Sequence, residues 1–292
     1  SGFAAVSLFG PTAREFQQLM GLSPAQVGLL VAAPSLSGSL LRIPFSAWVD
    51  TTGGRKPFLT LLWASIVGML GLVVIVHTRY PHSLSPSMYP LLLLLGVLSG
   101  SGIATFSVGI SQVSYWFPQS RQGWALGTYA GAGNLAPGIF SLLLPLVLGA
   151  AGLSTAYMAW LGLLLIGTLL YSRMGRNAPY FQLRARQVNP LEARARAHEL
   201  GEELFPAGTV RQTLAISARN GKTWALVVLY FTTFGGFIAL TAWLPTYWRE
   251  YFGASAFTAG ALTATFSILA SAVRIFGGSI SDRFGGETAA IV

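Results

Sequence analysis

Long apolar runs separated by short polar breaks dominate the 292-residue chain. A run of about 20 apolar residues is long enough to cross a bilayer as a helix. This pattern predicts spanning helices at residues 25–49, 57–76, 89–117, 123–148, 155–171, 223–244 and 258–281, with the tail of a first helix at 1–12 and the start of a ninth at 288–292. The chain is therefore predicted to be an all-α membrane protein.

Polar connections divide the predicted helices into two groups. Residues 173–222 are polar and alternate in charge (LEARARAHELGEEL), which is typical of a partly helical linker. Residues 77–87 form a loop on the opposite side of the membrane, and 118–122 form a tight connection. We expect an N-terminal six-helix half at 1–172, a linker at 173–222, and the start of a second half at 223–292.

An internal repeat relates the two halves. Twelve positions from Gly21 to Gly54 recur without a gap 232 residues later, and they include Ser35 with Ser267, Ser39 with Ser271, Arg42 with Arg274, and Asp50 with Asp282. At an offset of 234, Gly2, Phe3, Ala5, Pro11 and Thr12 match Gly236, Phe237, Ala239, Pro245 and Thr246. If the second half copies the first, the intact protein has twelve helices, and this sequence is a fragment with about the first eight.

Composition and charge agree with a membrane protein. The chain is 53% hydrophobic and only 9% charged, and it has no cysteine, which excludes disulfides and cysteine-based metal sites. Thirteen of the eighteen Lys and Arg residues fall on the side of the predicted linker. This asymmetry follows the positive-inside rule, so we expect an inner (cytoplasmic) membrane protein with residues 173–222 in the cytoplasm. The net charge of +9 is thereby explained without nucleic-acid binding.

Two arginines lie inside predicted spans. At ~1.5 Å per helical residue, Arg42 is ~12 Å from Asp50, well inside a hydrocarbon layer ~30 Å thick. An arginine there costs at least ~2.5 kcal/mol to insert and normally faces a cavity or partner. None of the nine Asp and Glu residues falls in a predicted span, so Arg42 and Arg274 lack a counter-ion there. Their planar forks suit an oxyanion, although a carboxylate on a helix beyond this sequence could pair with them instead.

The absence of titratable groups from the predicted spans bears on mechanism. Proton-coupled carriers usually hold an Asp, Glu or His in the membrane, whereas His77, His82 and His198 fall in loops. Exchange of one anion for another needs no proton carrier, so antiport is favoured over proton symport. The helices carry no nucleophile–base pair and no metal cluster, so we expect neither an enzyme nor a cofactor.

The fifth helix carries a glycine-rich stretch, GTYAGAGNLAPG, with Gly127, Gly131, Gly133, Asn134 and Gly138. Small residues four apart let helix backbones approach closely, which predicts a packing role for these glycines. A buried amide needs hydrogen-bond partners, so Asn134 is a candidate donor to an oxyanion.

The turn after the second helix resembles the G-x-x-x-D-x-x-G-R-K motif of the major facilitator superfamily. The matching residues are Ser46, Asp50, Gly53, Arg55 and Lys56, with serine for the first glycine and Gly54 inserted. The second copy has Gly278, Asp282, Gly285 and Gly286, followed by Glu287 instead of basic residues. The resemblance implies that Asp50, Arg55, Lys56 and Asp282 act in gating or packing at the linker side.

The fifth-helix stretch, the preceding FSVGISQVSYWFPQSRQGWALG, the later LYFTTFGGFIA and the paired arginines together resemble the nitrate/nitrite porter family of that superfamily. The resemblance implies a twelve-helix carrier that moves nitrate and nitrite by alternating access. It also implies an anion site formed by Arg42, Arg274, Asn134, Tyr230, Phe234 and Phe106. Tyr230 and Phe234 are four apart and share a helical face.

Several alternatives stay open at this point. A nitrate/proton symporter is the first, a carrier of other small anions is the second, and a non-transporting anion sensor with the linker as its output surface is the third. The expected partners are nitrate, nitrite and the lipid bilayer, with the protein a monomer.

Overall fold

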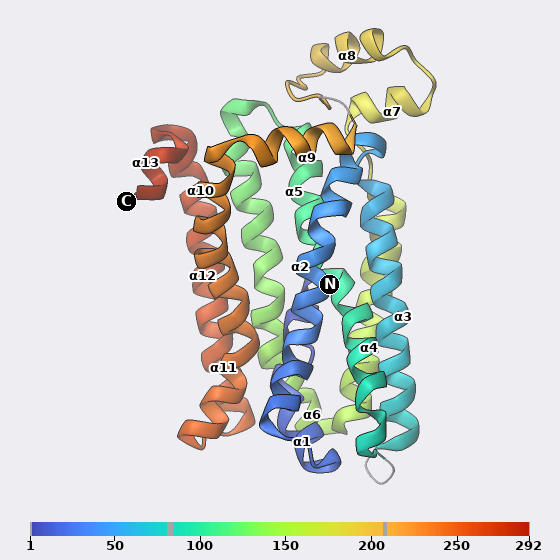
Figure 1. Ribbon diagram of the computed structural model, residues 1–292, viewed down its shortest axis with the longest axis vertical. Coiled ribbons are helices and arrows are strands. Elements are labelled where there is room, and N and C mark those ends of the chain that lie inside the picture. The colour runs from blue at the N-terminus through green and yellow to red at the C-terminus, as the bar shows by residue number, and fades with distance from the viewer. Residues whose placement is uncertain (1, 81–83, 207–208, 292) are drawn as a thin grey trace.

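A computed structural model describes residues 2–80, 84–206 and 209–291. Outside these ranges lie Ser1 of the predicted first helix, His82 of the predicted loop and Val292 of the predicted ninth helix. All elements in the described part of the chain are helical. Figure 1 shows long helices running side by side as a bundle, with α7, α8 and α9 gathered at one end. We call this the linker end and the opposite one the far end.

The first half contains six α-helices. They are α1 (Ala13–Met20), α2 (Pro24–Thr52), α3 (Arg55–Arg79), α4 (Tyr89–Gly100), α5 (Thr105–Trp116) and α6 (Gln122–Met174). α6 consists of two arms that meet at Gly152, whose φ of 78° turns the chain back through the bundle. These arms correspond to the predicted fifth and sixth helices.

The linker and the second half supply the remaining helices. The linker contains α7 (Pro179–Ala185), α8 (Pro190–Glu199) and α9 (Val210–Arg219), and the second half contains α10 (Gly221–Tyr230), α11 (Gly236–Phe252), α12 (Ala256–Phe284) and α13 (Gly286–Ile291). Within the described ranges, six segments are long and apolar enough to cross a membrane. The predicted all-α membrane fold is confirmed.

Three predicted helices differ from the structure. Residues 2–12 are not α-helical: Gly2–Ser7 and Gly10–Thr12 form 3-10 turns. The predicted helix 89–117 is interrupted by a 3-10 turn at Ser101–Ala104, where a Cβ on Gly102 would lie 2.8 Å from the backbone oxygen of Gly2. The predicted helix 223–244 contains a π-helical turn, Phe231–Gly235. Each irregular turn therefore lies where chain segments meet closely or where aromatic side chains gather.

Helix caps account for three of the twelve positions repeated at offset 232. The left-handed Gly21 and Gly253 end α1 and α11, and Gly53 and Gly285 follow α2 and α12 with positive φ. The hydroxyls of Ser23 and Ser255 accept hydrogen bonds from the first turns of α2 and α12. The repeat thus fixes where α2 and α12 begin and end, and so the depth at which Arg42 and Arg274 stand.

Candidate functional site

The duplicated arginines, Arg42 on α2 and Arg274 on α12, converge on one phenylalanine. Their guanidinium carbons lie 4.9 and 4.8 Å from the ring centroid of Phe234, and 5.9 and 5.8 Å from that of Phe106. Because both contact the same ring, the two carbons are no more than 9.7 Å apart. The near-equal distances reflect the repeat: equivalent helices present equivalent residues to one aromatic group.

A stack of aromatic rings forms the floor between the arginines. Phe106 and Phe234 stack at 5.1 Å between centroids, and Tyr230 stacks on Phe234 at 4.8 Å. Phe106 and Phe234 are 2% and 3% exposed, so water is excluded from this side of the site. Tyr230 keeps its hydroxyl within electrostatic range of both guanidinium groups.

Phe3 and Phe237 extend the stack, and the sequence reasoning did not assign them to the site. Phe3 lies 5.0 Å from Phe106, and Phe237 lies 6.0 Å from Phe234. A signal was present in the sequence, because these two residues are equivalent in the internal repeat at offset 234.

The positive charge of the site is not neutralised by protein. Within the described ranges, the ion pairs are Arg196 with Glu192 and Arg249 with Glu15, so neither Arg42 nor Arg274 meets a carboxylate there. The Nε and Nη2 atoms of Arg42 are buried and have no hydrogen-bond partner. A buried cation without a partner is costly, and an oxyanion would satisfy these donors.

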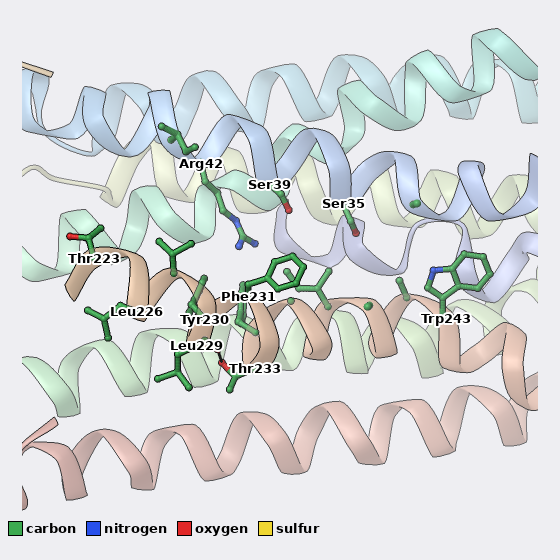
Figure 2. A pocket seen from close by; sticks show the side chains of 18 residues that line it. Ser35, Ser39, Arg42, Thr223, Leu226, Leu229, Tyr230, Phe231, Thr233 and Trp243 are labelled. Carbon is green, nitrogen blue, oxygen red and sulfur yellow. Dashed lines mark hydrogen bonds between the residues drawn. The ribbon is translucent and has the colours of Figure 1, made fainter. Parts of the chain in front are cut away.

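A cavity of about 990 Å³ adjoins the arginine pair (Figure 2). Ser35, Ser39 and Arg42 point into it from α2, and Tyr230 and Phe231 line the facing wall. In α12, the equivalent serines are fully buried against α6, and Ser267 donates to the backbone oxygen of Asn134 at 3.2 Å. The serine-bearing face of the helix is therefore covered by α6 on α12, whereas on α2 it faces the cavity.

The π-helical turn Phe231–Gly235 positions Phe234. Such a turn leaves backbone carbonyls without their usual partners, which is unfavourable in a membrane. The hydroxyls of Thr232 and Thr233 donate to the Leu229 carbonyl at 2.9 and 2.8 Å. These bonds explain how the widened turn is accommodated in an apolar span.

Asn134 does not line the cavity, and its backbone oxygen accepts the hydrogen bond of Ser267 on α12. Its side chain is 1% exposed, and its Oδ1 atom is buried without a partner. The preceding Gly133 faces Phe106, where an added Cβ would sit 3.5 Å from the ring. That spacing is ordinary contact, so close helix approach does not explain Gly133.

The other three glycines form a seam between α6 and α12. A Cβ on Gly127 would lie 2.9 Å from the Arg274 carbonyl oxygen, and one on Gly131 would lie 2.8 Å from the carbonyl oxygen of Ser271. At Gly138 it would lie 2.7 Å from Cβ of Ser267. Larger side chains would separate the helices and move Arg274 away from Phe234.

Asp282 joins the two halves at the linker end. Its carboxylate accepts hydrogen bonds from the backbone N–H groups of Gly123 and Trp124, at 2.6 and 2.7 Å. A carboxylate at the start of a helix is favoured by these free N–H groups and by the helix dipole. Its repeat partner Asp50 instead accepts from the Tyr115 hydroxyl, at 2.7 Å, within the first half.

Arg55 fastens the start of the linker to the turn between α2 and α3. Its side chain donates to the Ser172 carbonyl at 2.6 Å, and its backbone N–H donates to Oδ1 of Asn177 at 2.9 Å. Gly53 and Gly54 are buried, and the inserted Gly54 leaves room for Gln112. Lys56 is exposed. The inserted glycine thus adapts the turn to a closely packed polar neighbour.

Contacts at the far end also join the halves. Arg249 lies 4.0 Å from Glu15 and donates to the Pro11 carbonyl at 3.4 Å. Thr246 donates to the Gly10 carbonyl at 3.3 Å. The sequence reasoning assigned no gate to this end, although Pro11 and Thr246 belong to repeated positions.

A bundle of spanning helices built from two related halves, with a paired cation site where they meet, defines a duplicated polytopic membrane protein. The chain belongs to the Major Facilitator Superfamily, whose family model matches residues 1–292. Proteins of this superfamily are transporters, so an enzyme is not expected, as the sequence predicts.

Curated relatives narrow the resemblance further. The chain is 31% identical, over 96% of its length and 63% of the relative's, to the "probable nitrate/nitrite transporter NarK2" of Mycobacterium tuberculosis. It is 29% identical, over 100% of its length and 66% of the relative's, to the "probable nitrate transporter NarT" of Staphylococcus epidermidis. It is 31% identical, over 97% of its length and 59% of the relative's, to the "probable nitrate/nitrite antiporter NarK1" of Thermus thermophilus. The resemblance to nitrate/nitrite porters is confirmed, and the chain spans about 63% of the length of the first of these relatives.

Proposed function

We propose that the complete protein is a monomeric secondary transporter that exchanges nitrate and nitrite by alternating access. The observation that carries this proposal is the pair of guanidinium groups that contact the same ring, Phe234, with buried donors on Arg42 that no protein group in the described ranges satisfies. The printed names of the relatives support nitrate and nitrite as substrates.

The geometry fits a small planar anion. A bidentate bond to an oxyanion puts the guanidinium carbon about 4 Å from the centre of the anion. Two facing forks would then stand about 8 Å apart, within the limit of 9.7 Å set by the contacts with Phe234. The buried rings of Phe106 and Phe234 close one side of this gap.

Electrostatics links substrate binding to closure. At an effective dielectric constant of about 20, two positive charges at the upper limit of 9.7 Å repel by about 2 kcal/mol, and by more at any shorter separation. An anion about 4 Å from each would contribute about 4 kcal/mol of attraction per contact. The empty site therefore resists closing while the loaded site permits it, which is the behaviour required for exchange. Asn134 and Tyr230 supply further polar groups beside the anion.

The orientation follows from the basic linker. We propose that the linker end faces the cytoplasm, so Asp282 closes the cytoplasmic side of the interface and the contacts of Arg249 close the outer side. Transport then requires that the two sets of contacts break in turn. Asp50, Arg55 and Lys56 act at the same surface, where Arg55 ties the first half to the linker.

The test uses the full-length protein in proteoliposomes. Nitrate uptake is measured with or without internal nitrite, and with or without a proton gradient. Uptake that requires internal nitrite and ignores the gradient supports the exchanger. Uptake driven by the gradient alone would replace exchange with proton symport, and absence of uptake with retained nitrate binding would favour the sensor.

A further inference from the structure

Helix α9 has features that neither the anion site nor the gates explain. It lies across the linker end, roughly perpendicular to α10 and α11 (Figure 1). One residue, Asn220, separates α9 from α10, and its side chain accepts from the backbone N–H of Lys222 at 3.0 Å. Trp224 Nε1 donates to the Ala218 carbonyl at 2.9 Å and closes the corner. Because α10 begins a segment that is long and apolar enough to cross a membrane, this corner would direct α9 along the surface of a membrane crossed by α10.

The side chains of α9 are those of an interfacial helix. Leu214 is 40% exposed and Ile216 is 65% exposed in the described part of the chain, and because residues two apart lie on different faces of a helix, we assign only Leu214 to the side that faces the bilayer. Each has an arginine three residues away, Arg211 for Leu214 and Arg219 for Ile216, close enough to stand beside it on the helix. The ring of Trp224 is 58% exposed, and tryptophan favours the membrane–water interface.

The charged residues of α9 and α10 are all positive. Arg211, Arg219 and Lys222 are exposed, and the sequence contains no acidic residue between Glu203 and Glu250. None of the three forms an ion pair within the described ranges. Apolar side chains flanked by unpaired cations at the headgroup level match an anionic lipid surface.

We propose that α9 and the start of α10 bind acidic phospholipid headgroups in the leaflet at the linker end. Leu214 enters the boundary between headgroups and acyl chains, while Arg211, Arg219 and Lys222 contact the phosphates. The proposal depends on membrane insertion and not on which anion is carried.

Spin labels measure the depth of α9 directly. These 292 residues contain no cysteine, so Leu214→Cys is the single labelling site in this part of the chain, and any cysteine elsewhere in the full-length protein is replaced by serine first. In nanodiscs containing phosphatidylglycerol, the label is expected to collide with oxygen and not with a water-soluble nickel chelate. Ala195→Cys on α8, an exposed position, is the control and is expected to collide with nickel. A label at position 214 that is open to nickel, or protected from both reagents by other protein, would overturn the proposal.

A charge series tests the choice of lipid. Each Lys or Arg near an anionic surface strengthens binding about fivefold, so the combined variant Arg211→Gln/Arg219→Gln/Lys222→Gln should lose about 100-fold in affinity for phosphatidylglycerol. The matched control removes three linker arginines elsewhere, Arg184→Gln/Arg186→Gln/Arg196→Gln, and should change affinity less than twofold. Competition with a fluorescent phosphatidylglycerol, against phosphatidylcholine, reports both values. Equal losses in the two variants would mean that net charge alone attracts the lipid, and the assignment to α9 would fail.

Discussion

Replacement of Arg42 by lysine is the sharpest test of the anion site. Lysine keeps the positive charge but replaces a planar fork with a point charge, so it cannot make two parallel hydrogen bonds to one oxyanion. The variant loses at least one charge-assisted hydrogen bond, which is worth about 1.5–3 kcal/mol. Nitrate affinity should therefore fall about 10- to 100-fold. Because Arg274 stands at almost the same distances from Phe234 and Phe106, Arg274→Lys should have the same effect.

The assay is nitrate binding to the purified full-length protein by calorimetry, followed by uptake in proteoliposomes. Arg79→Lys is the matched control, because Arg79 is an exposed residue at the far end of α3. It should leave affinity unchanged. If Arg42→Lys bound nitrate within threefold of the unmodified protein, the bidentate clamp would be wrong. If the two lysine variants differed by more than tenfold, the symmetric arrangement about Phe234 would be wrong.

Three further predictions follow from the same structure. Gly127→Ala should destabilise the fold by about 1–3 kcal/mol and weaken nitrate binding, because the new Cβ meets the backbone of Arg274. Thermal unfolding in detergent measures the loss of stability. Gly149→Ala is the control, because no atom lies within 4 Å of a Cβ added there. Phe234→Leu removes the ring that both guanidinium groups contact, and each contact between a guanidinium group and the ring is worth about 0.5–2 kcal/mol. Calorimetry should therefore show nitrate binding at least fivefold weaker. Unchanged affinity would contradict the role of the ring. Burial raises the pKa of Glu202 from its ordinary 4.5 to about 7. The folded linker then binds more protons than the unfolded one between these values, so its stability is greatest below about pH 4.5 and falls by up to about 1.4 kcal/mol per unit as pH rises toward 7. Hydrogen exchange of α7, corrected for intrinsic rates, should show this fall, and Glu202→Gln should abolish it.

The sequence predicts the spanning helices well because each needs a long apolar run, and few other patterns are that long. It also predicts the position of Arg42 and Arg274, because an arginine in such a run stands out and the repeat marks it twice. The irregular turns were not predictable in the same way. The 3-10 turn at Ser101–Ala104 lies where Gly2, which is distant in sequence, approaches closely. A hydropathy pattern does not report such a contact.

The partners of the proposed gating residues also could not be predicted from local sequence. A motif indicated that Asp50 and Asp282 stand at equivalent turns, and the structure gives them different partners: a tyrosine hydroxyl for Asp50 and a helix start for Asp282. The partners belong to helices whose packing no local pattern specifies. Arg249 and Glu15 are 234 residues apart, and neither segment alone predicts their contact.

The π-helical turn at Phe231–Gly235 has a consequence for how this span tolerates insertions and deletions. A π-turn amounts to an α-helix that has absorbed one extra residue, so deleting one residue there would restore regular winding and leave the flanking segments, α10 and α11, with the same faces toward their neighbours. The residues of the turn itself would be spaced differently, so Phe234 would lose its place against both guanidinium groups, although the span would remain a continuous helix of adequate length. A one-residue deletion at this point should thus yield a protein that inserts and folds normally yet no longer holds its anion, a separation of membrane assembly from ligand recognition that few single changes could achieve.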